Sequence, residues 1–230
     1  MIKRLAIIPA RGGSKRIKNK NLKLFCGKPL IYYPIKAIKE SNLFSKIHIS
    51  SDSNKILNYC NKLKIKTDFK RPNNLADDKT SLSKVLDYVV SSYQNLNQSY
   101  DEVWLIFANN PFVTKKTLIN CSKAYKKISN YKNNALMTVT KYNYPVNWAQ
   151  KLHKKKYLIP LDVFSLKTRS QDFSKIFCEA GMINIYSSNK FNTKMKTKYF
   201  PFELPLHSSV DIDDIEDFKF AQKLFKKNYI

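Results

Sequence analysis

A short apolar run near the N-terminus, followed at once by a basic loop with two glycines, most constrains how this chain can fold. Leu5 to Ile8 is predicted to be a buried strand, since a short apolar run bounded by turn signals suits one. The loop that follows carries Gly12, Gly13, Ser14 and four cations within ten residues. Backbone N–H groups freed by glycine, flanked by cations, predict a polyphosphate site. A solvated basic turn is the alternative interpretation.

The scarcity of glycine and arginine favours the functional interpretation. The chain has 4 glycines in 230 residues, where average usage predicts roughly sixteen. Three of them (Gly12, Gly13 and Gly27) lie in this segment, where positive φ or close approach of a ligand would require them. Only five of the 42 basic residues are arginine, and a planar guanidinium suits bidentate recognition of anions. The five are Arg4, Arg11, Arg16, Arg71 and Arg169.

Apolar segments of strand and helix type alternate along the chain, which predicts an α/β fold with a mostly parallel sheet and helices on both faces. The predicted strands are Leu5–Ala10, Lys46–Ser51, Glu102–Ala108, Ala135–Thr140 and Met182–Tyr186. The predicted helices are Leu30–Ser41, Ser53–Leu63, Ser81–Leu96, Lys115–Lys127 and Asp214–Lys227. We expect one domain over residues 1–230.

A formal net charge of +25 raises the alternative of a basic nucleic-acid-binding domain. The lysines are scattered, and no zinc-finger, RNA-recognition or helix-turn-helix signature accompanies them, so we expect no specific nucleic-acid partner. The excess charge would still attract an anionic substrate over long range.

No apolar run approaches the length of a membrane span, and the chain enters a strand directly, without a signal-peptide pattern. The four cysteines lack close spacing, which argues against a zinc site and a disulfide framework. We therefore expect no membrane partner and a cytoplasmic location.

Several motifs, spread in order over nearly the whole chain, resemble those of the CMP-sialic acid synthetase (acylneuraminate cytidylyltransferase) family. They are Ile8–Arg16, Lys20-Asn21, Gly27–Pro29, Arg71–Asp77, Arg169–Asp172, Ala180-Gly181 and Asp211–Asp213. The resemblance implies a Rossmann-like nucleotidyltransferase fold. It also implies a reaction in which CTP and a nine-carbon acidic sugar give a CMP-sugar and pyrophosphate, for surface glycan synthesis.

The resemblance assigns the nucleotide site to the first loop and to the Arg71 segment. The implied nucleotide-binding residues are Arg11, Gly12, Gly13, Ser14, Lys20, Asn21 and Arg71. Arg11 and Lys20 would contact the phosphates and, with Asp211, are the candidate catalytic residues. For Lys15 and Arg16, phosphate contact and exposed surface charge are equally good interpretations. Near Arg71, helix capping is the preferred role for Asp77 and Asp78.

Asp211 and Asp213 are the candidate metal ligands. Alternation along a strand would point both carboxylates to one face, within reach of one Mg²⁺. A strand end with a helix N-cap at Asp213 or Asp214 is the alternative. Because the resembled family has its acidic pair at this place in the chain, we expect Asp211 and Asp213 to bind the metal.

Arg169, with Gln171 beside it, is the candidate partner for the sugar carboxylate. Ser170 stands where the N-acetylneuraminate branch is expected to have a second arginine, and Ala180-Gly181 resembles the pseudaminic acid branch. Pseudaminic acid is therefore the expected sugar, with legionaminic and N-acetylneuraminic acids as alternatives. The eight-carbon acid of lipopolysaccharide is the nearest other substrate, but its enzymes have a different first loop.

Between residues 141 and 171 the alternation breaks down into an aromatic, irregular insertion. In the resembled family this part forms an arm that docks on a second subunit and contributes to its active site. The resemblance therefore implies a homodimer, with Tyr142, Tyr144 and Trp148 as possible interface anchors. Packing within the chain explains these three aromatic residues about equally well.

Overall fold

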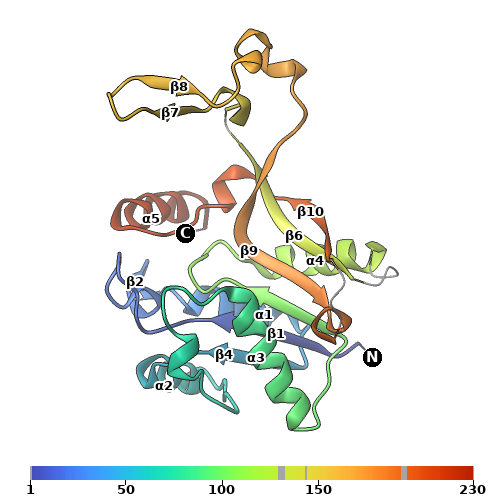
Figure 1. Ribbon diagram of the computed structural model, residues 1–230. Coiled ribbons are helices and arrows are strands. Elements are labelled where there is room, and N and C mark those ends of the chain that lie inside the picture. The colour runs from blue at the N-terminus through green and yellow to red at the C-terminus, as the bar shows by residue number, and fades with distance from the viewer. Residues whose placement is uncertain (1, 129–132, 143, 193–195, 230) are drawn as a thin grey trace.

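A computed structural model describes residues 2–128, 133–142, 144–192 and 196–229 of the chain. A six-stranded sheet runs through the body of the molecule in the order β10-β6-β9-β5-β1-β4 (Figure 1). Its strands are β1 (Arg4–Pro9), β4 (Lys46–Ser50), β5 (Glu102–Ile106), β6 (Asn134–Lys141), β9 (Phe177–Ser187) and β10 (Lys198–Glu203). The helices are α1 (Tyr32–Ser41), α2 (Asn54–Lys62), α3 (Leu82–Asn95), α4 (Lys115–Ile128) and α5 (Ile215–Tyr229). Two small hairpins complete the list: β2 (Leu24–Phe25) with β3 (Lys28–Pro29), and β7 (Gln150–Leu152) with β8 (Leu158–Pro160).

Five of the six sheet strands run in one direction. β1 pairs in parallel with both β4 and β5, and β10 pairs in parallel with β6. Only β9 is antiparallel to its neighbours, β5 and β6. The mostly parallel sheet predicted from the sequence is confirmed.

The two faces of the sheet follow from alternation along β1. Ala6 and Ile8 face a core formed with α1, α2, α4 and α5, whereas Leu5 and Ile7 face a smaller core formed with α3. All four side chains are fully buried, which explains why this strand is a continuous apolar run and not an alternating one. The helices therefore cover both faces, as predicted.

The five strands and five helices predicted from the alternation of apolar segments are all present, with ends displaced by a few residues. The one sheet strand that the sequence did not predict is β10, at the sheet edge. Most of its residues are exposed, and it contains Pro201, which an edge strand tolerates because it needs no further partner. With so little apolar character, its strand conformation depends on pairing with β6.

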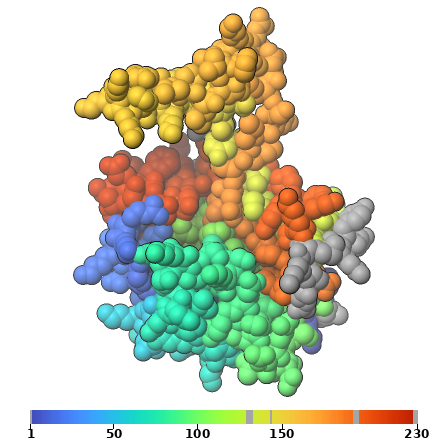
Figure 2. Space-filling model, in the orientation of Figure 1, coloured from blue at the N-terminus to red at the C-terminus, as the bar shows by residue number. Residues whose placement is uncertain are grey.

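The segment between β6 and β9 leaves the body as an arm (Figure 2). It contains the β7–β8 hairpin and several short 3-10 helices. Its apolar side chains are largely exposed: Phe164 is 91% exposed and Tyr144 81%. The irregular insertion predicted from the sequence is therefore a projecting arm with an apolar surface. No helix among the described residues is long and apolar enough to cross a membrane.

Candidate active site

A pocket of about 280 Å³ lies beyond the carboxyl ends of β1, β4 and β5. The chain passes from β1 to β4 on one side and then to β5 on the other, so the order of strands reverses here. Such a switch point is where open α/β sheets bind ligands. The polar and charged residues that line the pocket are Arg11, Ser14, Lys15, Arg16, Lys20, Asn21, Arg71, Asp77, Asp78, Thr80, Asn109 and Asp213.

One hydrogen bond ties the backbone of the first loop to the body, and another braces the loop internally. The N–H of Gly12 donates to Oδ1 of Asp52 at 2.8 Å, and Asn21 Nδ2 donates to the carbonyl of Arg11 at 3.1 Å. A Cβ on Gly12 would lie 2.9 Å from Cβ of Ser53, so the close approach requires glycine. The expectation that both glycines free N–H groups for phosphate is wrong for Gly12, whose N–H is taken by Asp52. Gly13 lies in open space with ordinary φ.

Arg11 and Lys15 converge on a carboxylate that the sequence did not assign to the pocket. Arg11 Nη1 lies 2.6 Å from Oδ1 of Asp78 and donates to the carbonyl of Asp77 at 2.9 Å. Lys15 Nζ contacts the other oxygen of Asp78. The two cations hold the pKa of the Asp78 carboxyl below its usual range, with Lys15 the larger cause.

Lys20 and Arg16 reach the opposite side of the pocket. Lys20 Nζ donates to the carbonyl of Ile212 at 2.7 Å and lies 3.5 Å from Oδ1 of Asp213. Arg16 Nη2 lies 2.9 Å from Oδ2 of the same carboxylate. Four cations of one loop therefore surround the pocket, two beside Asp78 and two beside Asp213. Lys15 and Arg16 both line the pocket, but their side chains are 79% and 65% exposed, so both interpretations that the sequence left open still stand.

Asp211 and Asp213 lie in a segment without regular secondary structure that pairs with no strand among the described residues, so the prediction of a strand here is wrong. The alternation is nevertheless present, because Ile212 between them is fully buried. Asn109 Nδ2 donates to Oδ1 of Asp211 at 2.5 Å. Asp211 remains exposed, but partial removal of its carboxyl from water raises its pKa, and the negative charge of Asp213 raises it further. Asp214 caps the N-terminus of α5, because its Oδ1 accepts hydrogen bonds from the N–H groups of Glu216 and Asp217, both at 2.9 Å.

The two carboxylates suit a magnesium ion in the way that nucleotide enzymes use it. Mg²⁺ binds one or two carboxylates and completes its shell with water and substrate phosphates. No group of three or more His, Cys, Asp or Glu ligands gathers in the part of the chain that the structure describes. Oδ2 of Asp211 makes no hydrogen bond within the described part of the chain. It lies close to Gly181, where a Cβ added to the glycine would be 3.7 Å from this oxygen. The donor set therefore fits Mg²⁺ shared with phosphate, and not an all-protein cage.

Arg71 is 4% exposed and forms part of the pocket wall. Its Nε donates to Oγ of Ser50 at 3.0 Å and its Nη2 donates to the carbonyl of Ser50 at 2.7 Å. Burial lowers the pKa of this guanidinium to about 10. The side chain is fixed by the end of β4, and Nη1 has no hydrogen bond to the residues that the structure describes. This leaves a donor for a ligand.

The expectation that Asp77 or Asp78 caps the next helix is wrong. Ser81 is the N-cap of α3 and accepts from the N–H of Lys84 at 3.4 Å. Asp77 instead closes a turn by accepting from the N–H groups of Lys79 and Thr80, at 3.0 and 2.6 Å. The sequence does not identify the N-cap of α3, because several polar residues precede this helix and any of them suits the role.

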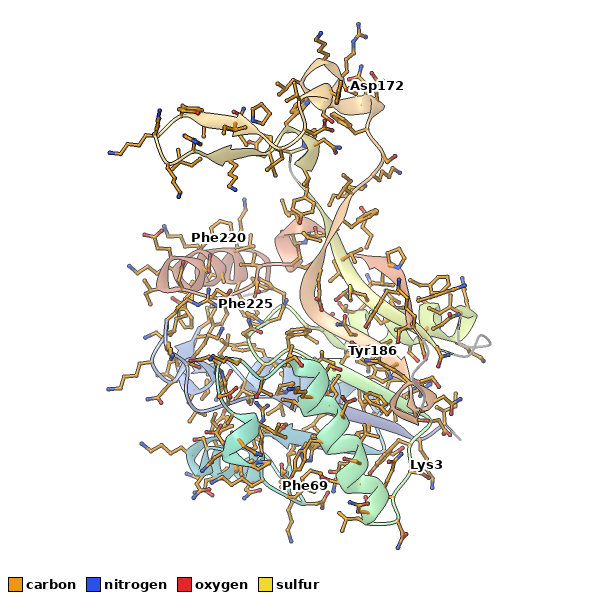
Figure 3. The ribbon with its side chains drawn as sticks, viewed as in Figure 1. Lys3, Phe69, Asp172, Tyr186, Phe220 and Phe225 are labelled. Atoms are coloured by element: carbon orange, nitrogen blue, oxygen red, sulfur yellow. The ribbon has the colours of Figure 1, made fainter. Side chains whose placement is uncertain are left out.

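Arg169 and Gln171 do not line the pocket with Arg11. Both lie on the arm, around the 3-10 helix Ser170–Asp172, and Figure 3 labels Asp172 at its far end. Gln171 lines a separate hollow of the arm with Tyr142 and Tyr144. The structure therefore does not unite the predicted sugar residues with the nucleotide loop inside one chain.

Sequence reasoning did not assign Asp52, Asp77, Asp78 or Asn109 to the site. Asp52 lies two residues beyond the end of β4 and Asn109 three residues beyond the end of β5, and this position beyond two strand ends was a usable signal. Asp78 had no such signal, because its role depends on how the segment before α3 folds over the first loop.

The model of the family described as Cytidylyltransferase matches residues 5–230 of the chain. A pseudaminic acid cytidylyltransferase of Campylobacter jejuni is 36% identical over 231 residues, covering 99% of this chain and 98% of the relative. An N-acylneuraminate cytidylyltransferase of Escherichia coli is 30% identical over 238 residues, covering 97% of this chain and 52% of that one.

The fold is similar to a solved structure of CMP:2-keto-3-deoxy-manno-octonic acid synthetase complexed with CTP. The TM-score is 0.70 at 12% identity, with 98% of this chain and 99% of that chain covered. At this identity the likeness concerns the fold alone, and it agrees with the nucleotidyltransferase fold expected from the sequence. The family match over nearly the whole chain decides the class of enzyme: this chain belongs to the cytidylyltransferase family of nucleotidyltransferases.

Proposed function

We propose that this protein transfers the cytidylyl group of CTP to a nonulosonic acid, with pseudaminic acid as the first choice. The observation that carries the proposal is the single pocket in which four cations of the first loop meet Asp78 and Asp213. A triphosphate needs such a group of cations, and the relative with 36% identity is a pseudaminic acid cytidylyltransferase. Legionaminic and N-acetylneuraminic acids are the alternative substrates. The reaction would take place in the cytoplasm, and its product would be used in the synthesis of surface glycans.

In the proposed reaction the anomeric hydroxyl of the sugar attacks the α-phosphorus of CTP. The new bond joins the sugar oxygen to the α-phosphorus, and the hydroxyl proton passes to solvent water. The bond from the α-phosphorus to its bridging oxygen breaks, and pyrophosphate leaves. Arg11, Lys15, Arg16 and Lys20 would hold the phosphates and neutralise the charge that develops on the leaving group. Arg71 would hold the nucleoside side through its remaining donor.

Asp211 and Asp213 would hold Mg²⁺ together with phosphate oxygens. The ion supplies charge neutralisation at the phosphates and lowers the pKa of the attacking hydroxyl. Within the protein, Asn109 orients Asp211 through a hydrogen bond to its carboxylate. Lys20 holds the segment that contains both carboxylates through its hydrogen bond to the carbonyl of Ile212. These contacts fix the carboxylates before the substrates arrive, which reduces the cost of ordering them.

The sugar side of the site is proposed to come from a second subunit. Arg169 and Gln171 lie on the arm, outside the pocket of their own chain, and the arm carries exposed apolar residues such as Phe164. In a symmetric dimer the arm of each subunit would bury this surface and bring Arg169 to the partner pocket. The carboxylate of the sugar would then meet a guanidinium.

The test is pyrophosphate release from CTP and Mg²⁺, with pseudaminic, legionaminic and N-acetylneuraminic acids offered in parallel. Fast release with one acid supports the proposal and identifies the sugar. CTP binding without release would direct the search to other acidic sugars, whereas the absence of CTP binding would refute the proposed site. The Arg11→Ala variant is the control: it should fold but lack activity, because this loop cation lies outside the core.

A further inference from the structure

The carboxylate of Asp78 occupies the cation pair that the proposed triphosphate needs. Its two oxygens are divided between two cations, with Oδ1 2.6 Å from Arg11 Nη1 and Oδ2 in contact with Lys15 Nζ. All three side chains line the same pocket. An anionic group with two oxygens, each bound to a separate cation, matches the pattern that a phosphate presents to such a site.

The charge state of Asp78 supports this comparison. Its pKa lies below the usual range because Lys15 and Arg11 donate to it, so the group is fully ionised at neutral pH. A triphosphate that enters the pocket must therefore share these cations with a fixed negative charge or take them over.

The backbone around Asp78 is built to allow displacement. The residue lies between the 3-10 helix Asn73–Leu75 and the α3 N-cap at Ser81, in the chain that leads into α3 (Figure 1). Its side chain is 41% exposed, and the adjacent turn is closed separately by Asp77, through the N–H groups of Lys79 and Thr80. Rotation of the Asp78 side chain into solvent would break its two ion pairs and leave that turn intact.

We propose that Asp78 is an internal competitor of the triphosphate: it holds Arg11 and Lys15 when no nucleotide is bound and yields them to the phosphates. This inference rests on the proposed nucleotide site and adds a determinant of its affinity. Removing the carboxylate leaves the two cations close together without a counter-charge. An incoming polyphosphate then gains their full attraction, so binding becomes tighter.

Isothermal titration of wild type and Asp78→Asn with CTP and with inorganic tripolyphosphate, both without divalent cations, tests the proposal. Two partly exposed ion pairs predict about three- to tenfold tighter binding of both ligands by Asp78→Asn. The matched control is Asp87→Asn, which makes the same charge change on the exposed surface of α3, outside the pocket. Thermal unfolding of each variant checks that the fold is retained.

Tighter binding of both ligands by Asp78→Asn but not by Asp87→Asn supports the competitor. Equal or weaker binding by Asp78→Asn overturns it, and weaker binding would make Asp78 a residue that positions Arg11. An equal gain in both variants also overturns it, because net charge alone would explain the gain. If wild type binds tripolyphosphate but not CTP, the proposed nucleotide function fails, while a gain with tripolyphosphate would still support the role of Asp78.

Discussion

Lys20 Nζ donates to the backbone carbonyl of Ile212 at 2.7 Å, which joins the first loop of the chain to the segment just before its last helix. The two residues are 192 positions apart in the sequence. Because Ile212 is fully buried and lies between Asp211 and Asp213, this one bond places a cation beside both candidate metal ligands. Together with the ion pair between Arg16 and Asp213, it joins the two ends of the chain in one site.

Lys20→Met keeps the apolar stem of the side chain and removes its charge. We expect kcat/KM for CTP to fall by about 10²–10³, the range typical for loss of one electrostatic group in a phosphoryl site. The carbonyl of Ile212 loses its donor, so the free energy of unfolding should fall by about 1 kcal/mol. Steady-state kinetics and urea denaturation measure the two effects. Lys18→Met is the control, since Lys18 is exposed in the same loop and does not line the pocket.

Asp211→Asn should separate stability from activity. Folding raises the pKa of this carboxyl, so at pH values above both its unfolded and its folded pKa the ionised group destabilises the native state. Asparagine removes that charge and can still accept from Asn109. We expect the Mg²⁺ dependence of turnover to weaken severely while Tm stays at or above the wild-type value. Metal titrations and calorimetry check this, and a lowered Tm with an unchanged metal titration would contradict both halves.

Arg71→Lys should damage nucleotide binding because lysine cannot reproduce the guanidinium fork. The variant loses the paired contacts to Ser50, so we expect about a tenfold weaker Kd for CTP and a loss of about 1–2 kcal/mol in unfolding free energy. Arg4→Lys is the matched control: Arg4 pairs with Glu102 at 2.7 Å, away from the pocket. Its stability should fall without any change in CTP affinity. Equal CTP binding by Arg71→Lys and wild type would remove Arg71 from the site.

His48 should make the protein sensitive to acid. Its Nδ1 lies 3.0 Å from the hydroxyl of Tyr93, which donates to Asp68, so Nδ1 carries the proton. Nε2 is buried and has no hydrogen-bond partner within the described part of the chain. Burial lowers the His48 pKa to about 3. Below about pH 6.5 only the unfolded chain takes up this proton, so stability is lost as the pH falls toward 3, by about 2 kcal/mol at pH 5.

Urea denaturation of wild type and His48→Asn at pH 7 and pH 5 measures the contribution of this histidine. Asparagine offers an N–H to Tyr93 and does not titrate. Its stability should therefore change less between the two pH values than that of wild type. The same change in both proteins would mean that other groups cause the acid sensitivity.

The proposed dimer predicts that Phe164→Ser, on the arm, shifts the protein from dimer to monomer in sedimentation velocity. Phe220→Ser is the control, since Phe220 is 58% exposed on the body, on the side of α5 opposite Phe225 (Figure 3). A wild-type monomer would contradict the proposal.

Subunit mixing tests whether the arm completes the partner pocket. Arg11→Ala and Arg169→Ala should each be inactive alone. In mixed dimers one of the two pockets combines an intact loop with an intact arm, so random exchange should restore about a quarter of wild-type activity. Continued inactivity after demonstrated exchange would place Arg169 outside the partner site.

Five of the six sheet strands, the five helices and the basic character of the first loop follow from local sequence patterns. The strand β1 can be recognised from its own residues, because a strand that is buried on both faces is apolar at successive positions. The same holds for α1 to α5, whose apolar stripes repeat at helical spacing. The cations of residues 11–20 also required no tertiary knowledge, since their loop directly follows a strand.

Which residues come into contact depends on how the whole chain packs. β10 is a strand because it pairs with β6, and its own residues carry little strand signal. Asp78 is bound to Arg11 because a loop folds across the pocket. Arg169 lies on a projecting arm, although its place in the sequence follows the family order. Local patterns depend on neighbours a few residues away, whereas these contacts join positions tens to hundreds of residues apart, and the packing of the whole sheet sets their geometry.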